Sequence, residues 1–336
     1  MTRLPSRYSP GLRFTFAFAV LAAVASATPA RAADDQGWFV FLDLANTQPA
    51  SLDQHFANHL DPSSGTTAVS ERLVIDNDAD LTFKIGGGYG FGDENGSLRV
   101  SYWSFDNDDE QSGSVNGGLY PTLFGYGYFG GGQYLYNVAG VAFEATSSVK
   151  ASTIDVDYLR EIVGGQKASL KWLAGLRIAS WEEDQGFEGH DGVSDYFQEK
   201  HFESDGIGLR VGAAAEFQFT EHFGMKSSLV FSFLHADSEG ESSQTFAIGA
   251  PPTDVRQASD DNLKGEMRDF DIKAVWTYGR MSYWAGYEAY EWEGMVADPV
   301  PPNDGLFLGG SASRGRDSVG FSGLHAGVAF KFGKGT

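Results

Sequence analysis

The chain has 336 residues, no cysteine, and 45 acidic residues against 24 basic ones, which gives a formal net charge of −21. The lack of cysteine excludes disulfides and thiolate metal sites, and the acidic excess argues against nucleic-acid binding, which neutralises phosphates with basic residues. Glycine is abundant at 43 residues, aromatic residues make up 14% of the chain, and helix signals are weak, so an all-β fold is predicted.

The N-terminus predicts export. Residues 1–32 have the pattern of a secretory signal peptide, with a basic start, an apolar run at 14–27 and an A-x-A cleavage site at 30–32. The apolar run is shorter than the roughly 20 residues that a membrane-spanning helix needs, and no twin-arginine pair precedes it. We therefore expect export through the Sec pathway and a single mature domain at 33–336, with 20 basic residues against 45 acidic ones and a net charge of −25.

The segment 153–180 predicts a β-hairpin. Two arms of alternating polarity flank a Gly-rich turn at 164–167, and a period of two is typical of strands. Trp172 belongs to the apolar face, whereas Asp155 and Arg177 belong to the opposite one. A polar face that carries full charges of both signs is unusual, but the hairpin alone does not separate a soluble sheet from a membrane barrel.

Connection lengths make that distinction. Ten alternating segments follow one another, at 38–45, 79–91, 97–105, the two arms of 153–180, 207–219, 223–236, 269–278, 281–293 and 318–332. Short connections (92–96, 163–167, 220–222, 279–280) alternate strictly with long ones (46–78, 106–141, 182–204, 237–264, 294–317). Outer-membrane barrels combine short periplasmic turns with long extracellular loops, and a sheet in hydrocarbon must close on itself. The sequence therefore predicts an all-β, transmembrane, antiparallel up-and-down β-barrel of about ten strands with long acidic extracellular loops.

A further hairpin in the aromatic segment 119–136 would raise the number of strands to twelve. Otherwise this segment is expected to be a loop at the rim or in the lumen.

Three stretches carry a resemblance to a known family. IDVDYLREI at 154–162, LKWLAGLRIASWEED at 170–184 and SVGFSGLHAGVAFKF at 318–332 resemble the pore-forming outer-membrane proteins typified by the major outer-membrane protein of Legionella. The resemblance is best over 144–336. It implies a β-barrel porin in the bacterial outer membrane and carries no enzymatic residues.

The inner face of the barrel follows from the alternation if the apolar face meets lipid. An Arg or Lys at the lipid midplane costs about 2–4 kcal/mol, so charged residues on the strands are expected inside. The predicted pore-lining residues are Asp43, Asp80, Lys84, Arg99, Asp155, Asp157, Glu161, Lys171, Arg177, Arg210, Glu216, Lys226, Asp269, Asp271, Lys273 and Glu288. Arg177 is expected to pair with Asp155 or Asp157, although alternation alone does not fix the register.

Aromatic residues on the apolar face near the strand ends predict an interfacial girdle. They are Trp38, Tyr89, Phe91, Tyr158, Phe217, Phe219, Phe223, Trp276, Tyr278, Tyr283, Phe330 and Phe332.

The sequence favours a porin-like barrel that forms a narrow channel for small hydrophilic solutes or ions, with a weak cation preference. Ten strands lie between eight, which leave room only for side chains, and sixteen, which leave an open channel. A structural or adhesive barrel with a charge-filled, non-conducting lumen is therefore the alternative. A protease at the extracellular rim, using His190, His201 or His235, comes third, so no enzymatic activity is expected.

Outer-membrane lipids, lipopolysaccharide, and small solutes or ions are the expected partners. No cofactor and no metal site is predicted.

Overall fold

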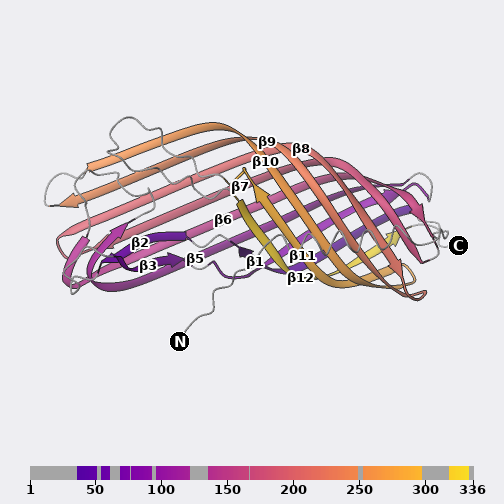
Figure 1. The fold of residues 1–336 in the computed structure, drawn as a ribbon, viewed down its shortest axis with the longest axis horizontal. Coiled ribbons are helices and arrows are strands. Elements are labelled where there is room, and N and C mark those ends of the chain that lie inside the picture. The colour runs from indigo at the N-terminus through magenta and orange to yellow at the C-terminus, as the bar shows by residue number, and fades with distance from the viewer. Residues whose placement is uncertain are drawn as a thin grey trace.

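The computed structural model (Figure 1) describes residues 36–50, 54–60, 69–75, 77–92, 96–121, 135–165, 167–248, 253–296 and 318–332. Its strands are β1 (Gly37–Ala50), β2 (Gln54–Leu60), β3 (Val69–Ile75), β4 (Asp80–Gly90), β5 (Ser97–Pro121), β6 (Leu135–Gly164), β7 (Ala168–His190), β8 (Ser194–Gln218), β9 (Phe223–Ile248), β10 (Thr253–Tyr278), β11 (Met281–Glu293) and β12 (Ser318–Phe332). No helix that could span a membrane occurs in these ranges. The predicted signal peptide, 1–32, lies outside them.

Ten of these strands close into one antiparallel ring. The order around the ring is β1, β4, β5 and then β6 to β12 in sequence. β5 pairs with β6, and β12 pairs with β1, so no edge is left open. Closure pairs the backbone groups that a free sheet edge would leave exposed to lipid. The prediction of a ten-stranded antiparallel barrel is confirmed.

The two remaining strands, β2 and β3, form a hairpin that arises from the connection 46–78. It adds to the far end of β5, where Ala57–Leu60 pairs with Gly118–Pro121. The additional hairpin therefore comes from a different connection than the one predicted, and its strands are not among the ten that close the ring. Most of the aromatic segment 119–136 lies outside the described residues, and its two ends extend β5 and β6.

All four short turns occur where the sequence predicts them. They join β4 to β5, β6 to β7, β8 to β9 and β10 to β11, and they lie at one end of the barrel because the strands alternate in direction. Gly279, in the tightest turn, has φ +59°, a left-handed conformation that glycine adopts without a steric penalty. By the rule for outer-membrane barrels, this end is periplasmic.

The long connections differ from the prediction, because the strands continue through most of them. β6 has 30 residues, and β8, β9 and β10 have 25 or 26. The predicted loop 182–204 is strand apart from 191–193, and the predicted loop 237–264 is strand outside 249–252. Crossing a membrane takes only about 9–11 residues, so the barrel continues well beyond the lipid, as the long ribbons of Figure 1 show.

Two parts of the barrel differ in what faces outward. In the part next to the short turns, here called the spanning part (for example 207–218 of β8), Leu209 is 64% exposed and Ile207 58%. In the part beyond it, here called the extension (for example 194–205 of β8), acidic residues make up most of the outward face, and aromatic residues such as Tyr196 and Phe202 are buried on the inward face. The outer surface of the spanning part is suited to lipid, and that of the extension to water.

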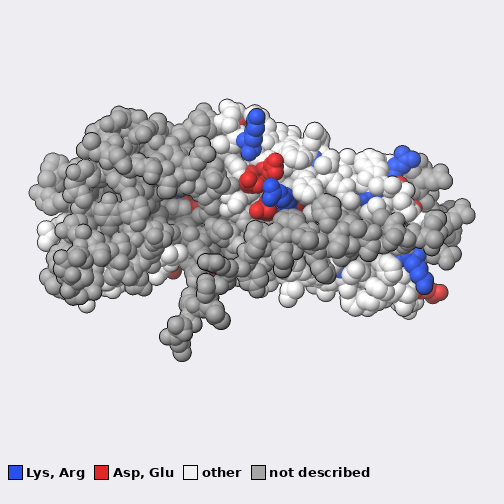
Figure 2. Space-filling model, in the orientation of Figure 1, with Lys and Arg blue, Asp and Glu red and all other residues white. Residues whose placement is uncertain are grey.

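The aromatic girdle is confirmed near the short turns. Trp38 and Tyr278 are exposed, and neighbouring rings contact one another, as in the pairs Trp38–Tyr89 and Phe223–Trp276. On the face that Figure 2 shows, charged side chains gather at mid-length and near the short-turn end, and the described surface between them carries few. An uncharged band bordered by aromatic rings is typical of a membrane-spanning barrel.

Candidate functional site

The centre of the spanning part holds a buried ion-pair network. Arg177 on β7 lies opposite Asp155 on β6 in register, and its Nε and Nη2 donate to the two Asp155 carboxylate oxygens at 2.7 and 2.9 Å. The same guanidinium donates to both oxygens of Asp269 on β10, at 2.9 and 2.6 Å. Since β7 and β10 are separated by two strands, Arg177 bridges the lumen.

Two more arginines complete what we call the lumen network. Arg210 on β8 contacts Asp155 and donates to Asp269 at 2.9 Å and to Asp157 at 3.3 Å. Arg99 on β5 donates to Asp157 at 2.8 Å. Three arginines therefore meet three aspartates, and all except Arg99 are buried. The pairing expected for Arg177 with Asp155 is present, and Asp269 is an additional partner that the sequence did not indicate.

A second group of polar residues lies beside this network, around His325 on β12. His325 Nδ1 lies 3.0 and 2.9 Å from the two Asp43 oxygens, and Trp284 Nε1 donates to Asp43 at 2.8 Å. On the other side of the ring, Nε2 lies 3.2 Å from Asp271. Lys273 also contacts Asp271, at 3.2 Å. His325 was not among the predicted lumen residues.

Glu288 and Lys84 lie near this second group. Glu288 is buried and accepts a hydrogen bond from the Tyr290 hydroxyl at 2.6 Å. The Lys84 ammonium lies 5.6 Å from the centroid of the Tyr290 ring.

The other predicted residues lie nearer the strand ends. Lys171 and Lys226 both donate to Glu216, at 3.2 and 3.0 Å, close to the short turns. Glu161 is half-buried next to the β6–β7 turn, and Asp80 is half-buried at the first residue of β4. The lumen network, the His325 group and the Glu216 group thus contain most of the predicted residues, and whether any of them lines a conducting pore remains a prediction.

An aromatic seal lies on the extension side of the lumen network. It consists of Trp103, Phe105, Trp181, Trp292 and Phe321, five buried residues from β5, β7, β11 and β12. The Trp181 and Trp292 ring centroids are 5.9 Å apart, and those of Phe105 and Phe321 are 4.9 Å apart. This seal is not among the features predicted from the sequence. The sequence pattern that could have revealed it is the alternation, because these residues lie on the same strand face as the inward-facing charges. Trp181, for example, follows Arg177 by four positions.

The interior of the extension is also packed. Phe56 on β2 is buried between Phe143 on β6 and Phe187 on β7, with ring centroids 5.6 and 5.8 Å away. The β2–β3 hairpin therefore contributes to a second apolar core beyond the aromatic seal.

The histidines considered for a protease face outward, His190 and His201 on the extension and His235 where it meets the spanning part. His201 pairs with Asp184 at 2.7 Å, and His190 pairs with Asp195. The hydrogen bond to Asp184 raises the pKa of His201. His235 lies opposite Ile207 on β8 and Lys264 on β10. The three histidines lie in separate cross-strand pairs and do not converge on one site.

A family model described as the Legionella pneumophila major outer membrane protein precursor matches residues 35–332. A search of curated proteins found no match.

Among solved structures, the outer membrane protease OmpT of Escherichia coli is 10% identical, with 90% of this chain and 99% of that chain covered and a TM-score of 0.44. The toluene transporter TodX of Pseudomonas putida is 10% identical, with 90% and 91% covered and a TM-score of 0.27.

Proposed function

The chain belongs to the Legionella pneumophila major outer membrane protein family. We propose that it is a structural outer-membrane barrel, closed to solutes, that acts through its extension at the cell surface. The aromatic seal carries the proposal. Trp181 is 0% exposed and Trp292 and Phe321 are each 1% exposed, although all three face the lumen. A water-filled passage would expose these rings to water.

The layers on either side support the same conclusion. On the periplasmic side, Arg177 ties β6 and β7 to β10 across the lumen. On the other side, a second apolar core packs inside the extension, with Phe56 in contact with Phe143 on β6 and Phe187 on β7. Solutes would therefore have to displace three packed layers, and ten strands enclose little space to begin with.

Conductance of the refolded protein in a planar lipid bilayer tests this proposal. The wild type should give no current steps above the protein-free background. Trp172→Ala is a suitable control, because Trp172 faces lipid on the same strand as Trp181, and it should be equally silent. Steady ion conductance of the wild type at low voltage would contradict a closed lumen.

A gated channel for small hydrophilic solutes or ions, with a weak cation preference, is the second candidate. Partly exposed charges in the periplasmic half of the lumen favour it, since the Lys226 side chain is 44% exposed and that of Glu216 is 32% exposed. A folded Trp103→Ala/Trp181→Ala/Trp292→Ala variant should then conduct. Asp155→Asn with Asp157→Asn should change its ion selectivity. If the folded triple variant is silent, the channel candidate fails and the closed barrel stands.

Lipopolysaccharide is the partner that we propose for the outer wall. Just beyond the apolar band, Glu182, Glu203 and Glu239 lie side by side on β7, β8 and β9. Like charges that lie directly opposite one another repel. Divalent cations shared with lipopolysaccharide phosphates would relieve this repulsion and hold the barrel in its membrane.

A further inference from the structure

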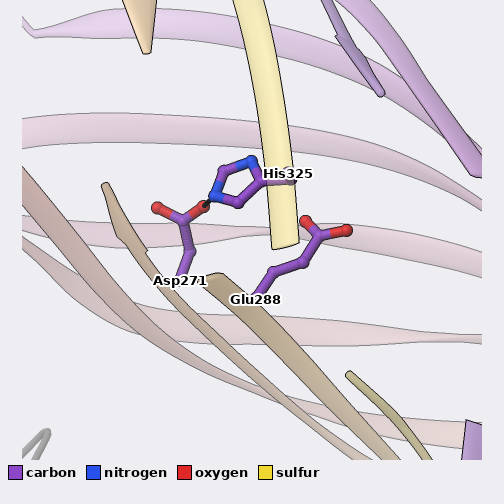
Figure 3. Close-up of side chains that lie close together, drawn as sticks. All are labelled: Asp271, Glu288 and His325. Carbon is purple, nitrogen blue, oxygen red and sulfur yellow. Dashed lines mark ion pairs between the residues drawn. The ribbon is translucent and has the colours of Figure 1, made fainter. Parts of the chain in front are cut away.

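Three potential metal ligands meet on the inner face of three neighbouring strands. Asp271 on β10, Glu288 on β11 and His325 on β12 each offer one ligand atom, and these atoms lie within 4.8 Å of one another. Figure 3 shows the two carboxylates on either side of the imidazole. Asp271 lies directly opposite Glu288 in the strand register. Two carboxylates opposite each other are unfavourable unless a cation lies between them.

The imidazole of His325 is oriented as in metal sites. Its Nδ1 lies 2.9 Å from Asp43 Oδ2, and Trp284 Nε1 holds the same carboxylate at 2.8 Å. Since ionised Asp43 only accepts hydrogen bonds, Nδ1 carries the proton. In the neutral ring, Nε2 then carries the lone pair. A histidine that binds a metal through one nitrogen almost always donates its other N–H to such a partner.

The second nitrogen of His325, Nε2, makes no hydrogen bond within the described part of the chain. The side chain is 0% exposed, and Asp271 Oδ2 lies 3.2 Å from Nε2. A lone pair that faces a carboxylate oxygen is repelled unless a proton or a metal ion lies between them. The absence of a side chain at Gly286 leaves room on this side, because a Cβ there would lie 2.7 Å from Nε2.

We propose that Asp271, Glu288 and His325 bind a divalent ion of the zinc class, with Asp43 as the residue that positions the imidazole. One imidazole and two carboxylates suit zinc better than calcium or magnesium, which prefer oxygen ligands alone. A tetrahedral zinc ion holds its ligand atoms about 3.3–3.5 Å apart. The Nε2–Asp271 distance of 3.2 Å is close to this value. The Glu288 ligand atom lies within 4.8 Å of the other two, so Glu288 must move closer to complete the set.

The ion has a route to the site and one competitor. The Asp271 side chain is 21% exposed, and it lies on the periplasmic side of the aromatic seal, so the site opens to the periplasmic half of the lumen. Lys273 contacts the same Asp271 oxygen at 3.2 Å and must turn away when the metal binds. Its ammonium already lies 5.2 Å from the centroid of the Trp284 ring, which offers an alternative contact.

The experiment measures zinc bound to the folded full-length protein in detergent. Metal-stripped wild type is titrated with zinc chloride by calorimetry, and the zinc retained after dialysis is counted by mass spectrometry. We expect about one zinc ion per chain, about 100-fold weaker binding for His325→Gln and Glu288→Gln, and about 10- to 100-fold weaker binding for Asp43→Asn. Glu216→Gln, which removes a lumen carboxylate outside the cluster, should bind as the wild type does.

Two results would overturn the site. The first is a wild type that retains no zinc, which would mean that a proton rather than a metal lies at Nε2. The second is equal zinc binding by the wild type and by whichever of His325→Gln and Glu288→Gln folds, judged by circular dichroism. Neither result bears on the closed barrel, which rests on the aromatic seal.

Discussion

The spanning part and the extension use the same strands with opposite polarity. On β7, Leu176 and Ile178 face outward and Arg177 faces inward, whereas only a few residues further along Trp181 and Phe187 face inward and Glu182 faces outward. The described register between β7 and β8 has no bulge, so the alternation itself continues unbroken. What changes along the strand is which face carries the apolar residues.

The difference shows that the surroundings of each part decide its pattern. Outside the spanning part lies hydrocarbon, so apolar residues face out and the charges must find partners inside. Outside the extension lies water, so the acidic residues face out and the apolar residues are buried as in a soluble sheet. The point where the apolar residues change face therefore marks the outer boundary of the membrane.

The largest expected effect comes from opening the lumen network. Arg177→Ala leaves Asp155 and Asp269 buried without their main partner, and breaking such a pair costs about 3–5 kcal/mol. Urea unfolding in lipid vesicles, followed by tryptophan fluorescence, measures the free energy of unfolding. Lys150→Ala, which removes the exposed pair with Glu182 on the extension, should cost no more than about 1 kcal/mol. Equal losses for the two variants would refute the buried role of Arg177.

An outward-facing arginine should distinguish the two parts directly. Val211→Arg on the lipid-facing side of β8 should cost about 2–4 kcal/mol. Phe197→Arg, also outward-facing and on the same strand but in the extension, should change the free energy of unfolding by less than about 0.5 kcal/mol. The same unfolding titration measures both. A large cost at both positions would mean that lipid also surrounds the extension.

Removing one charge from the row Glu182, Glu203 and Glu239 should stabilise the extension. Glu203 lies directly opposite Glu182 and Glu239, so Glu203→Gln should raise the free energy of unfolding by about 0.2–1 kcal/mol in EDTA at low salt. The gain should shrink when magnesium is added. Glu199→Gln is the control, since Gly186 and Ser243 lie opposite Glu199. The same gain for both variants would show that only net charge matters.

The smallest expected effect is a pH dependence of the extension through His201. The hydrogen bond to Asp184 raises the pKa of His201 in the folded protein. The pair therefore stabilises the extension at pH values below the unfolded pKa of about 6.5, and this contribution is lost as the pH rises through the folded pKa.

Hydrogen exchange of the β7 and β8 amides near Asp184 and His201, compared at pH 5.5 and 8.5, measures this contribution. Protection should fall more with rising pH in the wild type than in His201→Gln. An identical pH response in the two proteins would exclude the pair as its source.

Period-two alternation was enough to predict the spanning part. It located the ten strands, the four short turns, the aromatic girdle and the inward position of Asp155 and Arg177. These features are local, because one lipid-facing side and one short turn per hairpin leave their mark on neighbouring residues. The same rule failed at 182–204 and 237–264, where acidic side chains on the outer face gave the segments the composition of loops.

The sequence by itself thus determined the barrel, its turns and its lipid-facing side. Only the tertiary structure decided what fills the barrel. Arg177 binds Asp269, which lies 92 residues away in the sequence, and Phe105 contacts Phe321 across the lumen. Such contacts depend on the register and closure of all ten strands. The alternation along a single strand specifies neither the register nor the closure.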